Sequence, residues 1–231
     1  MKRLVFILFA VALVSAATIN ARAQESRQVS GFNSVASSGP FNVHIKIDGN
    51  ESVKVDADAD VINDIETVVE GNTLKIRFKD REYRHHNIHK AEVYVEAKSL
   101  NSLLNAGSGS IKVDGTISTD NFKAVLSGSG NISIAVKSES LHAVISGSGS
   151  VNLSGGTGEA DMVITGSGEI DGRHLKAESV VGTITGSGNI YIEAEKSIVG
   201  RITGSGSVIY SGNATSVTSH TTGSGRVTKE D

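Results

Sequence analysis

The sequence contains no cysteine, no tryptophan and one proline, and only 4% of its residues are aromatic. Without cysteine it has no disulfide framework and no thiol near the N-terminus that could carry a lipid. The few aromatic residues form no row on which sugars could stack. Glycine is abundant, with 26 among 231 residues. Regularly spaced apolar positions between the glycines argue against disorder.

The N-terminus has the three parts of a secretory signal peptide. A positive start, Met1-Lys2-Arg3, precedes an apolar run over 4–17 and an Ala-x-Ala site at Ala21-Arg22-Ala23. We therefore predict a signal peptide over residues 1–23, with cleavage before Gln24. An uncleaved anchor is the alternative, but the run falls short of the roughly 20 residues that a span requires.

Cleavage would remove three cations and no acid, which takes the formal net charge from −3 to −6. A mildly acidic protein offers no electrostatic surface for nucleic acid or anionic lipid. No later segment is apolar enough to cross a membrane. We expect an exported protein in the periplasm, on the outer-membrane surface or outside the cell.

A Gly-Ser-Gly motif recurs seven times at steps of 18 to 21 residues, and this fixed period predicts stacked repeats. The first glycines of the copies are Gly107, Gly128, Gly147, Gly166, Gly186, Gly204 and Gly223. Apolar residues lie at even offsets from them (−6, −2, +4 and +6), and even offsets share one face of a strand. One repeat cannot bury that face alone, so the copies must stack. We predict an all-β, single-stranded parallel β-helix (a β-solenoid) over 100–231, with coils of about 19 residues.

The motif itself has a mechanical explanation. A bend between two faces of a narrow coil requires φ values open to glycine, and both glycines should point inward, where a side chain would meet the opposite wall. We interpret the seven first glycines as structural corners. The intervening serines point outward and form a possible ligand-facing ladder, the alternative role for the motif: Ser129, Ser148, Ser167, Ser187 and Ser205.

Residues 24–99 are less regular, and we assign them to the same domain as an opening coil with capping strands. The segment 32–45 is a degenerate repeat containing Gly39-Pro40, and an outermost strand tolerates proline on its free side. An insertion follows, with strands at 52–57 and 91–97, an Asp-capped helical turn at 58–65, a hairpin over 67–78 and a charged loop over 79–90. The first, 21-residue step fits an early bulge near Leu100.

These residues resemble a known family, the putative auto-transporter adhesin head GIN domain family of exported bacterial proteins. The resemblance covers essentially the whole mature chain. It implies a single-domain β-solenoid at the cell envelope or surface, and it carries over no catalytic residue. The matching elements are Val29-Ser30-Gly31-Phe32, Ser38-Gly39-Pro40-Phe41-Asn42-Val43, Leu74-Lys75-Ile76, Val93-Tyr94-Val95 and the Gly-Ser-Gly repeats.

Two clusters of residues could bind a metal ion or catalyse a reaction. The histidine-rich segment Glu82, His85, His86 and His89 could hold zinc, but solvated charge in a loop is the preferred interpretation, so we predict no metal site. Glu169 and Asp171 lie about 7 Å apart on one strand face, within the range of an inverting glycosidase pair. Their expected neighbours on adjacent coils include no cation, so solvated carboxylates are preferred.

We therefore expect a non-enzymatic, exported envelope or surface protein that acts as a binding or adhesion module. No cofactor and no nucleic-acid partner are predicted, and the expected partner is a glycan or another surface protein. Two alternatives stay open: a carbohydrate-active enzyme (hydrolase or lyase) that uses Glu169 and Asp171, and a structural envelope protein that self-associates.

Overall fold

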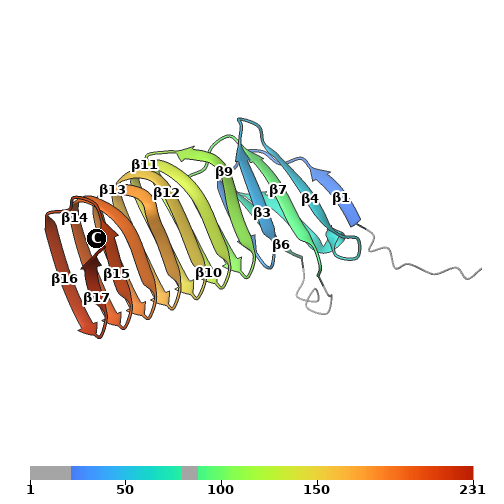
Figure 1. Cartoon of the computed structure of the whole chain (residues 1–231). Helices are drawn as coiled ribbons and strands as arrows, with labels where there is room; N and C mark the ends of the chain where they lie inside the picture. Colours follow the sequence, from blue (N-terminus) through green and yellow to red (C-terminus); the bar gives the residue numbers. More distant parts are fainter. Residues whose placement is uncertain (1–21, 80–87, 231) are drawn as a thin grey trace, which may run out of the picture.

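A computed structural model describes residues 22–79 and 88–230. Seventeen strands form one hydrogen-bonded sheet that winds into stacked parallel coils, which confirms the predicted β-solenoid. Figure 1 shows the coils as a regular stack leading away from a less regular N-terminal end. The predicted signal peptide lies outside the described residues, except for Arg22 and Ala23, which begin the first strand.

The strands are short near the N-terminus and long in the repeats, where one strand bends through two sides of a coil. The N-terminal strands are β1 (Arg22–Arg27), β2 (Ser34–Ser38), β3 (Asn42–Ile47), β4 (Ser52–Asp58), β5 (Ile65–Glu70), β6 (Thr73–Phe78) and β7 (Ala91–Ala97). The repeat strands are β8 (Ser102–Gly107), β9 (Ser110–Ser118), β10 (Asn121–Gly128), β11 (Asn131–Gly147), β12 (Ser150–Gly166), β13 (Glu169–Gly186), β14 (Asn189–Gly204), β15 (Ser207–Ser211), β16 (Ser216–Gly223) and β17 (Arg226–Lys229).

The pairing register divides the solenoid into two faces. Face I contains β5, β6, β2, β8, β10, the second halves of β11 to β14, and β16. From β8 onward these strands run into the Gly-Ser-Gly corners. Face II contains β1, β4, β7, β3, β9, the first halves of β11 to β14, β15 and β17. From β9 onward these strands leave the Gly-Ser-Gly corners. Each coil of the repeat region therefore has one tight glycine corner and one wider bend, and in β11 to β14 this bend lies within a continuous strand.

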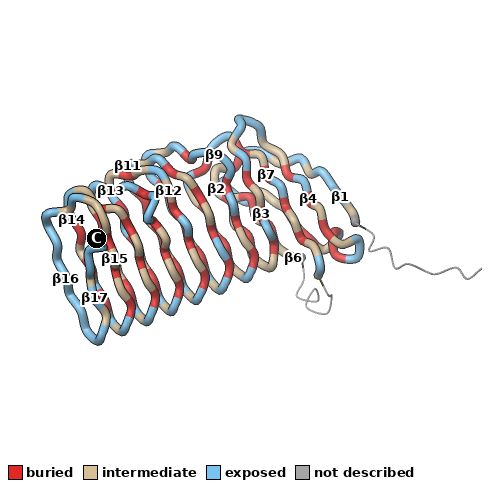
Figure 2. Tube along the Cα trace, viewed as in Figure 1, coloured by how far each residue is buried: buried red, intermediate tan, exposed pale blue. Residues whose placement is uncertain are grey.

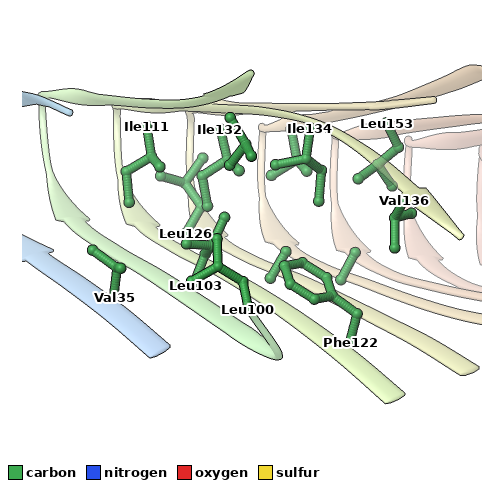
Figure 3. Close-up of a cluster of buried hydrophobic side chains, with 14 of the residues drawn as sticks. Val35, Leu100, Leu103, Ile111, Phe122, Leu126, Ile132, Ile134, Val136 and Leu153 are labelled. Carbon is green, nitrogen blue, oxygen red and sulfur yellow. The ribbon is translucent and has the colours of Figure 1, made fainter. Parts of the chain in front are cut away.

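The apolar residues at even offsets fill the space between the two faces, as predicted. Figure 3 shows Leu126 of face I and Ile132 and Ile134 of face II projecting into this space, and all three are buried. The alternation of buried and more exposed residues continues along the coils before the last one in Figure 2. The residue four places before a corner is small in the last coils of the core, where the opposite face reaches across: a β-carbon on Gly200 would lie 2.3 Å from Cγ2 of Val227.

The 21-residue step has a different cause from the predicted one. Where β9 pairs with β11, Lys112 lies opposite Ser133 and Thr116 lies opposite Ala135. Over this stretch β9 therefore contains two more residues than β11. The two additional residues thus lie after the corner rather than near Leu100. Gly115, within this bulge, has φ of +97°, a conformation that favours glycine.

The degenerate repeat at 32–45 is not the outermost coil, which corrects the sequence interpretation. Its two strands pair on both sides: β2 lies between β6 and β8, and β3 lies between β7 and β9. The later strands β6 and β7 therefore form the coil outside it. Pro40 is tolerated because it lies in the corner between β2 and β3, outside both strands.

The insertion closes the N-terminal end of the solenoid. The hairpin of β5 and β6 forms as predicted, and β4 and β1 extend face II by antiparallel pairing. The Arg27 guanidinium joins the two faces, because its Nη1 donates to the carbonyl oxygen of Ile65 at 2.6 Å and its Nη2 to that of Ile62 at 3.1 Å. These contacts satisfy carbonyl groups where the stack ends.

The predicted helical turn is a short 3₁₀ helix, η1 (Ile62–Asp64), and it has no side-chain cap. Val61, Ile62 and Ile65 are buried, as the pattern suggested. The aspartate cap was wrong: Asp58 Oδ2 instead accepts the backbone N–H groups of His89 (2.7 Å) and Lys90 (3.1 Å). Asp58 therefore anchors the start of β7.

The last coil keeps Val227 against the core but replaces part of its apolar interior with polar residues. Ser219, Thr221 and Lys229 occupy offsets that hold aliphatic or small residues in earlier coils, and β16 is exposed throughout. Polar residues at a terminal edge reduce the tendency of an open sheet to pair further. Among the described residues, no helix has the length and apolarity needed to cross a membrane.

Candidate functional site

The seven corner glycines lie along the narrow edge where face I turns into face II. All seven have φ between +119° and +153°. A β-carbon on Gly166 would lie 2.4 Å from the carbonyl oxygen of Gly147, and the same relation recurs from coil to coil. For the first glycine of each motif the obstacle is thus the backbone of the preceding coil, which corrects the sequence argument. For the second glycine a side chain of the opposite face is also in the way, as predicted: a β-carbon on Gly168 would lie 2.7 Å from Cγ2 of Ile145.

The serines of the corners form an exposed column along this edge. The backbone N–H of Ser148 donates to the carbonyl oxygen of Gly128 at 3.0 Å, and Ser167 repeats the contact with Gly147. Their backbones therefore belong to the stack while their hydroxyls face solvent. The five serines proposed as a ladder share this exposed position: Ser129, Ser148, Ser167, Ser187 and Ser205.

Glu169 and Asp171 lie on the outward side of β13, in register with the polar neighbours expected from the sequence. The sequence argument missed a cation beside them. Arg173 Nη1 lies 2.8 Å from Asp171 Oδ2, and its guanidinium lies 3.5 Å from the ring centroid of Tyr191. Because Asp171 is engaged in this ion pair, the arrangement does not leave two carboxylates free for acid–base chemistry.

Three of the four histidine-cluster residues, Glu82, His85 and His86, lie outside the described residues. His89 is exposed, and its described contact is the backbone hydrogen bond to Asp58. Within residues 22–79 and 88–230, no group of three or more His, Cys, Asp or Glu side chains could hold a metal ion.

The outward side of face II carries two continuous rows of side chains, one residue from each strand. The first, which we call the amide row, is rich in asparagine and serine: Gln24, Asp56, Glu92, Asn42, Ser110, Asn131, Ser150, Glu169, Asn189, Ser207 and Arg226. The second, the tyrosine row, runs beside it: Ser26, Lys54, Tyr94, His44, Lys112, Ser133, Asn152, Asp171, Tyr191, Ile209 and Thr228.

The N-terminal end of the tyrosine row lies in a groove of about 580 Å³. Tyr94 is 42% exposed although it is large and partly apolar. Its ring stacks against the ring of His44, with centroids 5.1 Å apart and planes inclined by 18°. Lys54 flanks the pair on β4 and Lys112 flanks it on β9. A concave surface with an aromatic floor and a few polar groups is typical of a ligand site.

The groove is more cationic than the protein as a whole. Of the six charged side chains that line it, four are lysine or arginine and two are acidic, Glu96 and Asp114, while the chain is net negative. Arg27 donates a hydrogen bond to the carbonyl oxygen of Ile65 at the N-terminal end of the solenoid, and Lys46 Nζ lies 3.2 Å from Asp48 Oδ2. A hydrogen bond from the backbone N–H of Asn50, followed by the contact with Lys46, lowers the pKa of Asp48.

The other polar groups of the groove differ in their surroundings. His44 Nε2 lies 2.7 Å from Glu92 Oε2, which fixes the imidazole beside Tyr94. Glu96 accepts a hydrogen bond from Ser52 Oγ at 2.8 Å. Within the described part of the chain, neither Lys54 nor Lys112 has an ion-pair partner. Two ammonium groups are therefore available to a ligand in the groove.

Sequence reasoning did not find this groove. The alternation in Ala91–Ala97 does place Tyr94 on the outward side of its strand, a usable signal for one residue. Its neighbours come from strands that are distant in sequence, and only the pairing register shows that Lys54, His44 and Lys112 lie beside it.

Comparisons with known proteins agree with the fold. A family model described as "Putative auto-transporter adhesin, head GIN domain" matches residues 31–214. A putative adhesin from Bacteroides fragilis has a solved structure with a TM-score of 0.85 and 24% identity, over 92% of this chain and 98% of that chain. No match was found among the curated proteins.

Two further solved structures come from Parabacteroides. A putative adhesin from Parabacteroides merdae has a TM-score of 0.74 and 20% identity, over 91% of this chain and 96% of that chain. A putative lipid binding protein from Parabacteroides distasonis has a TM-score of 0.70 and 21% identity, over 91% of this chain and 97% of that chain. At such identities the likeness shows a shared fold.

Proposed function

We propose that this chain, which belongs to the putative auto-transporter adhesin head GIN domain family, is an exported, non-enzymatic binding module of the cell envelope or cell surface. It uses the outward side of face II to hold a glycan or another surface protein. Adhesin is the description shared by the family model and by two of the solved structures with this fold.

The observation that carries this proposal is the pair of rows on face II. Each strand contributes one outward residue to each row, so successive groups repeat at about 4.8 Å along the stack. Serine hydroxyls and asparagine amides dominate the amide row, and these groups both donate and accept hydrogen bonds. Such a surface continues along the whole stack, and it suits an extended partner better than a small substrate.

An enzymatic role has less support. The carboxylate pair considered for glycoside hydrolysis includes Asp171, which is paired with Arg173. The corner serines face solvent at the edge of the stack. Catalysis requires a base within hydrogen-bond reach of a nucleophile or of the proton it removes, together with groups that stabilise the developing charge.

Three serines spaced two residues apart allow a direct test, because they lie on three different surfaces. Ser146 is outward on face I, Ser148 is at the corner, and Ser150 is in the amide row on face II. Each is replaced singly by arginine in the mature chain, and binding to a glycan array and to intact bacterial cells is measured. Circular dichroism and thermal unfolding check that each variant is folded.

We expect Ser150→Arg to reduce binding strongly, because the larger arginine side chain obstructs the amide row. Ser146→Arg and Ser148→Arg should bind as the original chain does. Loss of binding in Ser148→Arg alone would move the site to the serine ladder at the corners. If the original chain binds neither the array nor cells, the proposed binding role itself is wrong.

A further inference from the structure

We propose that the groove over Tyr94 binds an acidic saccharide, with a sugar ring against the tyrosine and carboxylates held by Lys54 and Lys112. This inference rests on the proposed function and specifies its ligand class. The groove belongs to the outward side of face II, so an oligosaccharide seated there continues naturally along the amide and tyrosine rows.

The aromatic part of the site is preorganised. His44 stacks on one face of the Tyr94 ring, and Glu92 holds the imidazole through a 2.7 Å contact. The pairing register puts Lys54 on the other side of Tyr94. Tyr94 lines the groove and is 42% exposed. The apolar C–H side of a sugar can therefore pack against the exposed part of the ring while its hydroxyls remain hydrated or hydrogen-bonded.

The unpaired lysines of the groove favour an acidic ligand over a neutral one. Lys46, Arg27 and His44 already have polar partners, whereas Lys54 and Lys112 have no ion-pair partner in the described part of the chain. They lie three strand spacings apart in the tyrosine row, about 14 Å. That span is wider than one sugar ring, so the arrangement favours an oligosaccharide that presents carboxylates on more than one residue.

Other anionic partners fit less well. A nucleic acid needs a series of phosphate contacts, but this groove supplies two free ammonium groups. Membrane binding by charge needs a cluster of several basic residues near the surface. Here Glu96 and Asp114 lie among the lysines, and they would repel a uniformly anionic surface more than a ligand with separated charges.

The test uses the mature full-length chain and isothermal titration calorimetry. The probes are tetragalacturonic acid, its methyl-esterified neutral form, a hyaluronan tetrasaccharide and sialyllactose, each titrated up to its solubility limit. We expect at least one acidic probe to bind, and binding to weaken at high salt because exposed charges are screened. The neutral ester should bind about tenfold more weakly than the acid.

Variants then locate the site. Tyr94→Ala and the double variant Lys54→Gln/Lys112→Gln should each raise Kd about five- to tenfold. Lys123→Gln, an exposed lysine on face I, is the matched control and should change Kd less than about twofold. A Tyr94→Phe variant, which keeps the ring, should bind nearly as well as the original chain.

The inference is overturned if no acidic probe binds, if acid and ester bind equally, or if Tyr94→Ala leaves Kd unchanged. Vesicles containing phosphatidylglycerol provide a further arm: binding to them without saccharide binding would assign the groove to membranes instead. If the chain still recognises cells or a neutral polysaccharide while these titrations fail, the binding role stands and only the ligand class is wrong.

Discussion

The carbonyl oxygen of Gly147 occupies the space that a β-carbon on Gly166 would need, at a separation of 2.4 Å. The same oxygen accepts the backbone N–H of Ser167 at 3.0 Å, and Gly166 has φ of +125°. Backbone strain and a steric overlap therefore coincide at one corner. We expect Gly166→Ala to lower the free energy of unfolding by about 1–3 kcal/mol, measured by urea denaturation.

The control for this prediction is the adjacent residue. Ser167 is exposed, so Ser167→Ala should change stability by less than about 0.5 kcal/mol. Equal stability of Gly166→Ala and Ser167→Ala would show that the corner glycines are not required for stacking.

The stability of the N-terminal cap should depend on pH through Glu51. Its Oε2 accepts a hydrogen bond from Lys98 Nζ at 2.7 Å, and its Oε1 accepts the backbone N–H groups of Phe32 at 3.2 Å and Gly31 at 2.9 Å. The Lys98 contact, supported by the two backbone groups, lowers the pKa of Glu51 below its ordinary value of 4.5. The folded state thus favours the charged carboxylate.

A lowered folded-state pKa stabilises the protein above the unfolded-state pKa, and this contribution is lost as the pH falls through the folded-state pKa. We expect Glu51→Gln to be less stable than the original chain at neutral pH, with the difference shrinking below pH 4.5. Urea midpoints across an acidic pH series measure this. Glu139→Gln, at an exposed position, is the control, and a Glu51→Gln deficit of constant size at every pH would contradict the argument.

The enzymatic alternative makes a separate prediction. The original chain should release no reducing ends from a panel of acidic and neutral polysaccharides, because Asp171 is held by Arg173. Asp171→Asn should also change stability by less than about 1 kcal/mol, since partly exposed ion pairs contribute little. Release of sugar ends that disappears in Glu169→Gln would instead establish a hydrolase.

Export processing can be checked by N-terminal sequencing of the protein secreted from a bacterial host. We expect a mature chain that begins at Gln24. Such a chain keeps Gln24–Arg27 of β1, including the Arg27 contacts that join the two faces. A mature terminus beyond Arg27 would remove the strand and contradict both the cleavage site and the role of Arg27 at the cap.

The sequence by itself determined the repeating architecture. Glycines at a fixed step and aliphatic residues at even offsets, such as Leu126 and Ile132, predict parallel coils because only stacking can bury their shared face. The hairpin around Gly71-Asn72 was also readable, since a local turn and two alternating strands define it. These features depend on neighbours within one repeat or one turn.

Only the tertiary structure decided which distant strands meet. The coil of β6 and β7 lies outside the earlier coil of β2 and β3, an order that no local pattern encodes. The same pairing brings Tyr94, His44 and Lys54 together, and it places Arg173 against Asp171 and Tyr191. The repeat length and the even spacing of the apolar residues determine how the chain coils. Strand order and register are set by the packing of the whole stack, and they determine which side chains share a surface.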